Sequence, residues 1–159
     1  MKFRLFARAV DKIGFLSLSF LVKGENRLKE PKSDTKSPAG LRVLIVDDND
    51  MLRSFLRDML KFHSHKIVAE TDGLDDTVKA YQEHAPDLVT LDLSLSQTNG
   101  LEVLAALRKV DRRAKVLIVS GNNQKRIRQQ ALATGADGFL AKPFTTRELM
   151  SAIALLFPL

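Results

Sequence analysis

Short apolar segments alternate with amphipathic segments five times along residues 41–159. Segments such as Leu41–Val46 (LRVLIV) and Lys115–Val119 (KVLIV) are almost continuously apolar, which is typical of strands buried on both faces. The segments between them, such as Asn49–Phe62, place apolar residues at helical spacing. Strands that alternate with helices form crossover units, and these units produce parallel sheets covered by helices. The sequence therefore predicts an α/β fold: a doubly wound, five-stranded parallel sheet flanked by five helices.

The bounds of these elements follow from the apolar patterns and from the turn residues between them. The expected strands are Leu41–Val46, His65–Ala69, Asp87–Leu91, Lys115–Val119 and Gly138–Ala141. The expected helices are Asn49–Phe62, Leu74–His84, Leu101–Lys109, Gln124–Thr134 and Thr145–Phe157. Thr145 with Glu148 three residues later is a capping box, which predicts where the last helix begins. Pro86 and Gly135 mark the ends of two other helices.

Residues 1–40 differ in composition from the rest of the chain. They hold nine Lys and Arg against four Asp and Glu, so most of the net charge of +6 belongs to this segment. Residues 23–40 are polar and contain two prolines, which is typical of a linker. We therefore expect a poorly ordered basic and apolar extension at 1–40 and one domain at 41–159. A secretion signal and a helix lying on a membrane surface are two alternatives for residues 1–22.

Several classes of function are excluded by what the sequence lacks. The chain contains no cysteine, which excludes thiolate nucleophiles and cysteine-bound metal sites. No apolar run reaches the roughly 18 residues that a membrane-spanning helix needs. No Gly-rich phosphate loop follows the first strand, so a nucleotide site is not indicated. Because the basic excess lies outside the domain, direct binding of nucleic acid is not expected either.

Charged and polar residues follow four of the five predicted strands. Asp47 and Asp48 follow the first strand and Asp92 follows the third, while Ser120 and Lys142 follow the fourth and fifth. Each of these residues alone is most simply a turn, a helix cap or a solvated side chain. Ligands of parallel α/β sheets bind beyond the carboxyl ends of the strands, however, and there these five side chains would converge.

The expected cluster has a definite chemistry. Three close carboxylates repel one another, and a hard divalent cation such as Mg²⁺ relieves that repulsion with oxygen ligands. A carboxylate can also attack phosphorus and form an aspartyl phosphate. Lys142 is then placed to neutralise phosphoryl oxygens, and Ser120 to donate a hydrogen bond to one of them. The residues therefore indicate Mg²⁺-dependent phosphoryl chemistry.

Four motifs carry this cluster: VDDND at 46–50, LDLSLSQTNGLE at 91–102, VSG at 119–121 and GADGFLAKPF at 135–144. Asp48 and Asp92 are 44 positions apart, and Ser120 and Lys142 are 22 apart. Taken together, the motifs and spacings resemble the receiver domain of response regulators, the CheY-like module of two-component signalling. The resemblance spans essentially all of residues 41–157. It implies a CheY-like (flavodoxin-like) sheet with strand order 2-1-3-4-5 and a cytoplasmic protein.

The resemblance implies a role for each acidic residue. Asp92 corresponds to the phosphoacceptor of the family. Asp48 corresponds to a direct Mg²⁺ ligand, and Asp47 to an acidic neighbour that acts mainly through water. Ser94 corresponds to the residue whose backbone carbonyl is the third protein ligand of the metal.

The resemblance also implies a conformational switch. Ser120 corresponds to the hydroxyl that turns toward the phosphoryl group, and Lys142 to the lysine that contacts that group. Phe139 corresponds to the aromatic switch residue, whose ring moves inward when the hydroxyl is recruited. The bond between Lys142 and Pro143 is typically cis in this family.

The family's phosphoryl donors are histidine kinases and histidine phosphotransfer proteins. Signalling would follow from a population shift of the face formed by the fourth predicted helix, the fifth strand and the fifth helix. That face would bind an unknown downstream protein or form a homodimer. Lys125, Arg126 and Arg128 on it are expected to form a solvated face or part of a partner surface. Because only two residues follow the last helix, we expect a single-domain signalling phosphoacceptor with slow self-catalysed turnover, rather than a metabolic enzyme.

Two departures from the family pattern leave alternatives open. Leu95-Ser96 and Asn99-Gly100 stand where a Met-Pro pair and an Asp-Gly pair are usual, which predicts a looser loop after Asp92. A degenerate receiver that acts as a phosphorylation-independent binding module is therefore one rival. A phosphatase on a similar sheet is the other, although it would need a second general acid where Ser94 stands.

Overall fold

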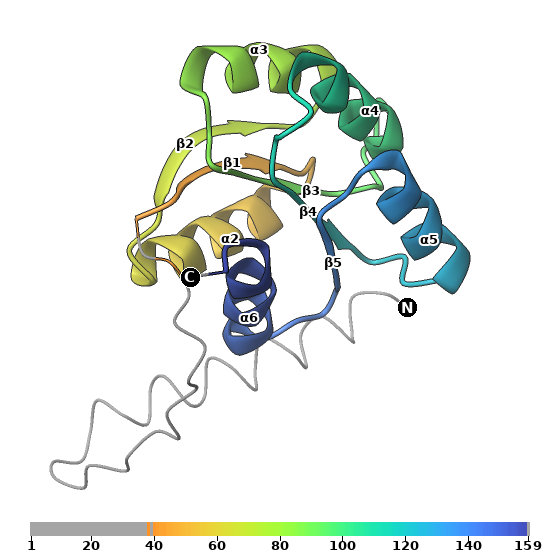
Figure 1. Ribbon diagram of the computed structural model, residues 1–159. Helices are drawn as coiled ribbons and strands as arrows, with labels where there is room; N and C mark the ends of the chain where they lie inside the picture. The colour runs from red at the N-terminus through yellow and green to blue at the C-terminus, as the bar shows by residue number, and fades with distance from the viewer. Residues whose placement is uncertain (1–37, 39, 159) are drawn as a thin grey trace, which may run out of the picture. The chain divides into compact units, whose positions relative to one another are not determined.

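The computed structural model describes residue 38 and residues 40–158 (Figure 1). The strands are β1 (Arg42–Val46), β2 (Lys66–Thr71), β3 (Leu88–Leu91), β4 (Val116–Ser120) and β5 (Gly138–Ala141). The helices are α2 (Asp50–Phe62), α3 (Leu74–His84), α4 (Gly100–Val110), α5 (Lys125–Thr134) and α6 (Thr146–Leu156). The predictions made for residues 1–37 lie outside this range. Within it, no helix has both the length and the apolar character needed to cross a membrane.

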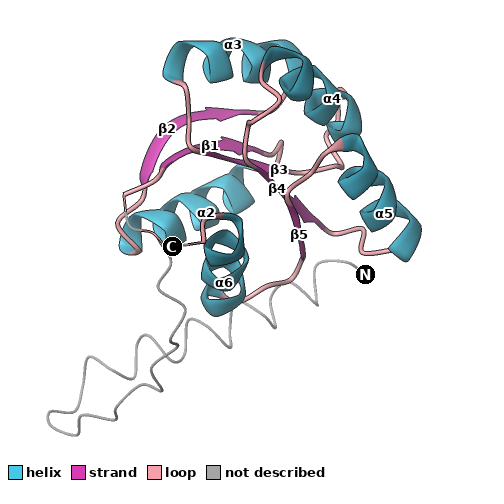
Figure 2. Cartoon of the chain, viewed as in Figure 1, coloured by secondary structure: helices cyan, strands magenta, loops and turns pink. Residues whose placement is uncertain are grey.

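The strands form one parallel sheet in the order β2-β1-β3-β4-β5, as predicted. Helices α2 and α6 cover one face of the sheet, and α3, α4 and α5 cover the other (Figures 1 and 2). The fold is therefore the doubly wound α/β arrangement that the alternating sequence pattern indicates.

Each face of the sheet has its own apolar core. The central strands are buried on both faces, and Val43, Leu44 and Ile45 of β1 are all 0% exposed. Because side chains alternate along a strand, Val43 and Ile45 pack under α2 and α6, whereas Leu44 packs under α3 and α4. This alternation continues past the strand ends and decides where the polar residues there point.

The ends of three helices agree with the sequence analysis. Thr145 and Glu148 form the predicted capping box at the start of α6. Gly135, with φ 112°, ends α5 in the left-handed conformation that glycine adopts readily. Helix α3 ends at His84, as predicted, and its C-cap residue Ala85 is left-handed with φ 42°, directly before Pro86.

Strand β2 differs from its predicted bounds. It begins at Lys66 and runs to Thr71, whereas the pattern predicted His65–Ala69. The register between β1 and β2 shifts after Val43, which is the mark of a bulge, so the strand carries one residue more than simple alternation predicts. His65 belongs to the preceding turn, where its side chain is buried.

Candidate functional site

The alternation of side chains brings Asp47, Asp92 and Lys142 to the same face of the sheet. Ile45 and Leu140 pack on the side of α2 and α6, and Asp47 and Lys142 lie two positions further along the same strands. The register of β1 and β3 then brings Asp92 beside Asp47. Local strand geometry therefore brings together three of the five side chains that the sequence analysis expected to converge.

One ammonium group lies between two buried carboxylates. Nζ of Lys142 donates hydrogen bonds to Oδ2 of Asp92 at 2.7 Å and to Oδ2 of Asp47 at 2.9 Å. Asp47 is 1% exposed and Asp92 is 6% exposed. Asp48 lies close enough that one oxygen from each of the three aspartates falls within 4.8 Å of the others. Three carboxylates against one ammonium leave an excess of negative charge, which suits a divalent cation with oxygen ligands.

Burial makes the charge of Asp47 costly. Desolvation is the largest effect and raises the pKa of Asp47 above its ordinary value. The hydrogen bond and charge of Lys142 and the backbone N–H of Asn49 act in the opposite direction without cancelling it, and the charge of Asp92 raises the pKa further. A cation bound at the cluster would favour the ionised carboxylate.

The loop after Asp92 is held by several hydrogen bonds. The N–H of Ser94 donates to Oδ1 of Asp92 at 3.0 Å, and the N–H of Ser96 donates to Oδ2 of Asp48 at 2.7 Å. Ser94 also forms an isolated bridge with Asn99. These contacts tie the loop to the carboxylates themselves, so it is fastened without the family's usual proline.

Gly100 is a residue of this site that sequence reasoning missed. It is the first residue of α4, and a Cβ built on it would lie 2.3 Å from the backbone oxygen of Asp92 and 2.5 Å from Cα of Leu93. Both neighbours are main-chain atoms and cannot rotate away. Only a residue without a side chain therefore lets α4 begin against the backbone of the Asp92 loop. The Asn99-Gly100 pair signals a turn in the sequence, but nothing in it signals this close approach.

Ser120 and Phe139 lie on the other face of the sheet. Ile118 and Phe139 are register partners and pack on the side of α3, α4 and α5, and Ser120 lies two positions after Ile118. Ser120 is 0% exposed, and its Oγ accepts the N–H of Asn122 at 3.2 Å. Among the described residues, Ser120 is joined to the acidic cluster by a backbone hydrogen bond and not by its side chain. The N–H of Lys142 donates to the Ser120 carbonyl at 2.9 Å. The Lys142–Pro143 bond is cis, as expected.

Comparison with known proteins identifies the family. The model of the response regulator receiver domain matches residues 43–154. The chain belongs to this family. The chemotaxis protein CheY of Bacillus subtilis is 33% identical over 112 residues, which cover 70% of this chain and 93% of that protein. The chain is therefore a CheY-like receiver of two-component signalling. Receivers of this kind work with histidine kinases and downstream targets.

Solved structures agree with this assignment. CheY of Borrelia burgdorferi, crystallised with CheX, BeF₃ and Mg²⁺, matches with a TM-score of 0.72 at 24% identity, over 75% of this chain and 90% of that one, which supports the fold. A response regulator from Burkholderia pseudomallei with a phosphorylated aspartic acid and a calcium ion matches with a TM-score of 0.66 at 26% identity. That match covers 71% of this chain and 66% of the other.

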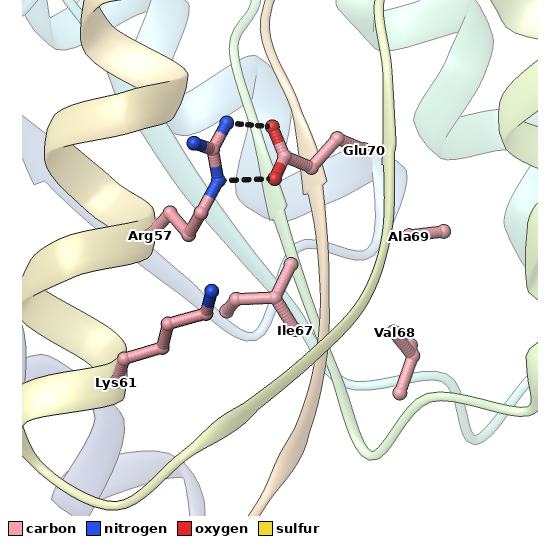
Figure 3. A pocket seen from close by; sticks show the side chains of 6 residues that line it. All are labelled: Arg57, Lys61, Ile67, Val68, Ala69 and Glu70. Carbon is pink, nitrogen blue, oxygen red and sulfur yellow. Dashed lines mark hydrogen bonds and ion pairs between the residues drawn. The ribbon is translucent and has the colours of Figure 1, made fainter.

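A cavity of about 470 Å³ lies elsewhere in this receiver domain, between α2 and β2 (Figure 3). Arg57 spans one side of it and binds Glu70 through two hydrogen bonds of 2.5 and 2.7 Å. That bidentate bond is the main reason why the pKa of Glu70 lies below its ordinary value. The cavity shares no residue with the acidic cluster.

Proposed function

We propose that this protein accepts a phosphoryl group on Asp92 from the phosphohistidine of a kinase or a phosphotransfer protein. The observation that carries the proposal is the 2.7 Å contact between Lys142 and Asp92 within a group of three carboxylates. The family match and the phosphorylated aspartic acid of the Burkholderia pseudomallei relative support the same chemistry.

The oxygen donors of the cluster fit a magnesium ion. Asp47, Asp48 and Asp92 would hold it, together with the backbone carbonyl of Ser94. When bound, Mg²⁺ supplies positive charge that neutralises both the carboxylates and a phosphoryl group. The raised pKa of Asp47 supports this assignment, because the buried carboxylate lacks enough positive charge from the protein alone.

With the metal bound, the side chains already described account for the bonds that form and break in the transfer. A carboxylate oxygen of Asp92 attacks phosphorus, the new P–O bond forms and the P–N bond to the donor histidine breaks. The electron pair of the P–N bond stays on the imidazole nitrogen. The imidazole leaves as a neutral ring when it carries one proton. Lys142 stabilises the charge that builds on the phosphoryl oxygens, and its contact with Asp92 supports this role.

Phosphorylation would act on the face formed by α5, β5 and α6. Recruitment of the Ser120 hydroxyl to the phosphoryl group would vacate space that the ring of Phe139 can enter, which changes this face. Helices α5 and α6 also carry the exposed apolar residues Leu132 and Leu155, which are 43% and 82% exposed and suit contact with a protein. We propose that a downstream protein binds this face. The binding would take place in the cytoplasm, where the phosphodonors are. A second copy of this chain is the alternative partner.

The intact mass after incubation with acetyl phosphate and Mg²⁺ tests the proposal. The wild type should gain one phosphoryl group, and omission of Mg²⁺ should prevent it. Asp92→Asn should gain none, because an amide is a poor nucleophile. Asp58→Asn is the matched control, since Asp58 is an exposed aspartate of α2, and it should label like the wild type. Labelling of Asp92→Asn would overturn the assignment, and a folded wild type that never labels would favour a phosphorylation-independent binding module.

A further inference from the structure

Arg128 faces the ring of Phe139. The central carbon of its guanidinium lies 5.7 Å from the ring centroid, within the range of a cation–π contact. Arg128 lies on the exposed side of α5, and no salt bridge joins it to a carboxylate within residues 40–158. The sequence analysis expected a solvated or partner-facing arginine. The residue is exposed, and its side chain also contacts an aromatic ring of the same domain.

The sheet register places Phe139 diagonally across from Ser120. Phe139 pairs with Ile118, and Ser120 pairs with Ala141, so the two side chains lie on one face and one step apart along neighbouring strands. Ala141 presents only a methyl group beside Ser120. Arg128 of α5 therefore lies on one side of the Phe139 ring. On the side toward Ser120, the neighbouring position holds only the small side chain of Ala141.

Helix α5 is built so that it can hold the ring. Ala131 lies one helical turn after Arg128, is 0% exposed and belongs to the core against which Phe139 packs. Its small side chain brings α5 close to the sheet, and Arg128 on the same helix side then reaches over the ring.

We propose that Arg128 is a positioning residue that holds the Phe139 ring on the α5 side and so favours the unphosphorylated conformation. This inference rests on the proposed function, because it assigns a regulator to the same site. Movement of the ring toward Ser120 would break the contact with the guanidinium. The contact and phosphorylation are thermodynamically linked. The free energy by which phosphorylation weakens the contact therefore equals the free energy by which loss of the contact favours phosphorylation.

The charge of Arg128 alone predicts the opposite effect. An exposed cation near the site attracts an anionic phosphodonor, so its removal by itself would slow phosphorylation. A faster rate after removal of the charge is therefore evidence for the contact with the ring.

The experiment measures the initial rate of labelling by acetyl phosphate with Mg²⁺ in five proteins: the wild type, three single variants and one double variant. Arg128→Met keeps the apolar stem and removes the charge, and we expect it to label about two- to fivefold faster than the wild type. Arg126→Met removes an exposed charge of the same helix and is the matched control, with an unchanged or slower rate expected. In a Phe139→Leu background, Arg128→Met should have no further effect on the rate. Urea unfolding of all variants verifies that they are folded.

The outcomes separate this inference from the proposed function. A wild type that does not label overturns the proposed function, and the inference with it. Equal labelling rates of the wild type and Arg128→Met would overturn this inference but not the proposed function. The inference is also overturned if Arg126→Met gives the same acceleration, or if the acceleration persists without the ring of Phe139. A lower unfolding midpoint without a change of rate would show that Arg128 only stabilises the fold.

Discussion

Lys142 and Asp92 are fifty positions apart in the chain, and their side chains meet at 2.7 Å. The same ammonium also binds the buried carboxylate of Asp47. Removal of one partner from a buried ion pair leaves charge that nothing compensates, which is far more costly than the loss of an exposed pair. We therefore expect Lys142 to stabilise the metal-free protein in addition to its proposed role in phosphoryl transfer.

We expect Lys142→Met to lower the free energy of unfolding of the metal-free protein at neutral pH by about 3 kcal/mol. Mg²⁺ should stabilise this variant more than it stabilises the wild type, because the cation replaces charge that the lysine supplied. Urea unfolding in EDTA and in Mg²⁺ measures both effects. Lys79→Met changes an exposed lysine of α3 and should leave both values at the wild-type level. Equal stabilisation by Mg²⁺ in the wild type and Lys142→Met would contradict a shared site.

Gly100→Ala tests the close approach of α4 to the Asp92 loop. The added methyl would overlap main-chain atoms, so the loop must shift, at a cost of about 2–3 kcal/mol in stability. A displaced Asp92 should also be phosphorylated roughly tenfold more slowly or worse. Gly121→Ala is the control, because a Cβ there meets nothing within 4 Å, and its unfolding midpoint should hardly change. A stable Gly100→Ala protein with normal labelling would show that the loop is not confined there.

The parts of this site that were predictable are those that local geometry determines. Asp47, Asp92 and Lys142 follow strands directly, so the predicted strands, with the strand order that the family resemblance implies, were enough to bring them together. Gly100 and Arg128 were not predictable in this way. Their roles depend on how closely a helix packs against a loop or a ring from another element, and one sequence contains no signal for such a distance.

The turn before β2 shows a second limit. His65 was predicted to belong to a strand that includes the apolar residues Ile67–Ala69. The bulge that lengthens β2 and the turn at its start arise from the pairing of two strands, which periodicity within one segment does not report.

We expect stability to fall on acidification because of His65. Its side chain is 4% exposed, and neither ring nitrogen has a hydrogen-bond partner among the described residues. Burial lowers the pKa of His65 below its ordinary value of 6.5, and the nearby charge of His63 lowers it further. The folded state thus binds this proton less readily than the unfolded state does. The stabilisation is complete above pH 6.5 and is lost as the pH falls toward the lowered pKa.

Unfolding by urea between pH 7.5 and pH 5 measures this loss, whose slope approaches about 1.4 kcal/mol per pH unit for one proton. His65→Leu should flatten the dependence in this range. An unchanged slope in His65→Leu would show that other groups cause the acid sensitivity.

Two buried threonines should respond to the same substitution with opposite sign. Thr90 of β3 is 1% exposed, and its Oγ1 has no hydrogen-bond partner within the described part of the chain. Replacement by valine removes a buried polar atom at nearly constant shape, so we expect Thr90→Val to raise the free energy of unfolding by about 1 kcal/mol. Thr77 of α3 is 0% exposed, but its Oγ1 donates to the carbonyl of Gly73 and contacts Oγ1 of Thr71 at 2.8 Å. Thr77→Val should therefore lower stability by about 1–2 kcal/mol.

Thr90 also lies two positions before Asp92 on the same strand face, directly beneath the acidic cluster. Labelling by acetyl phosphate distinguishes a purely structural position from one that serves the site. We expect Thr90→Val to label at the wild-type rate, because no contact joins its hydroxyl to Asp92 among the described residues. A more stable Thr90→Val that labels slowly would instead show that the hydroxyl is retained for phosphorylation. A less stable Thr90→Val would show that the hydroxyl has a partner, such as a buried water molecule.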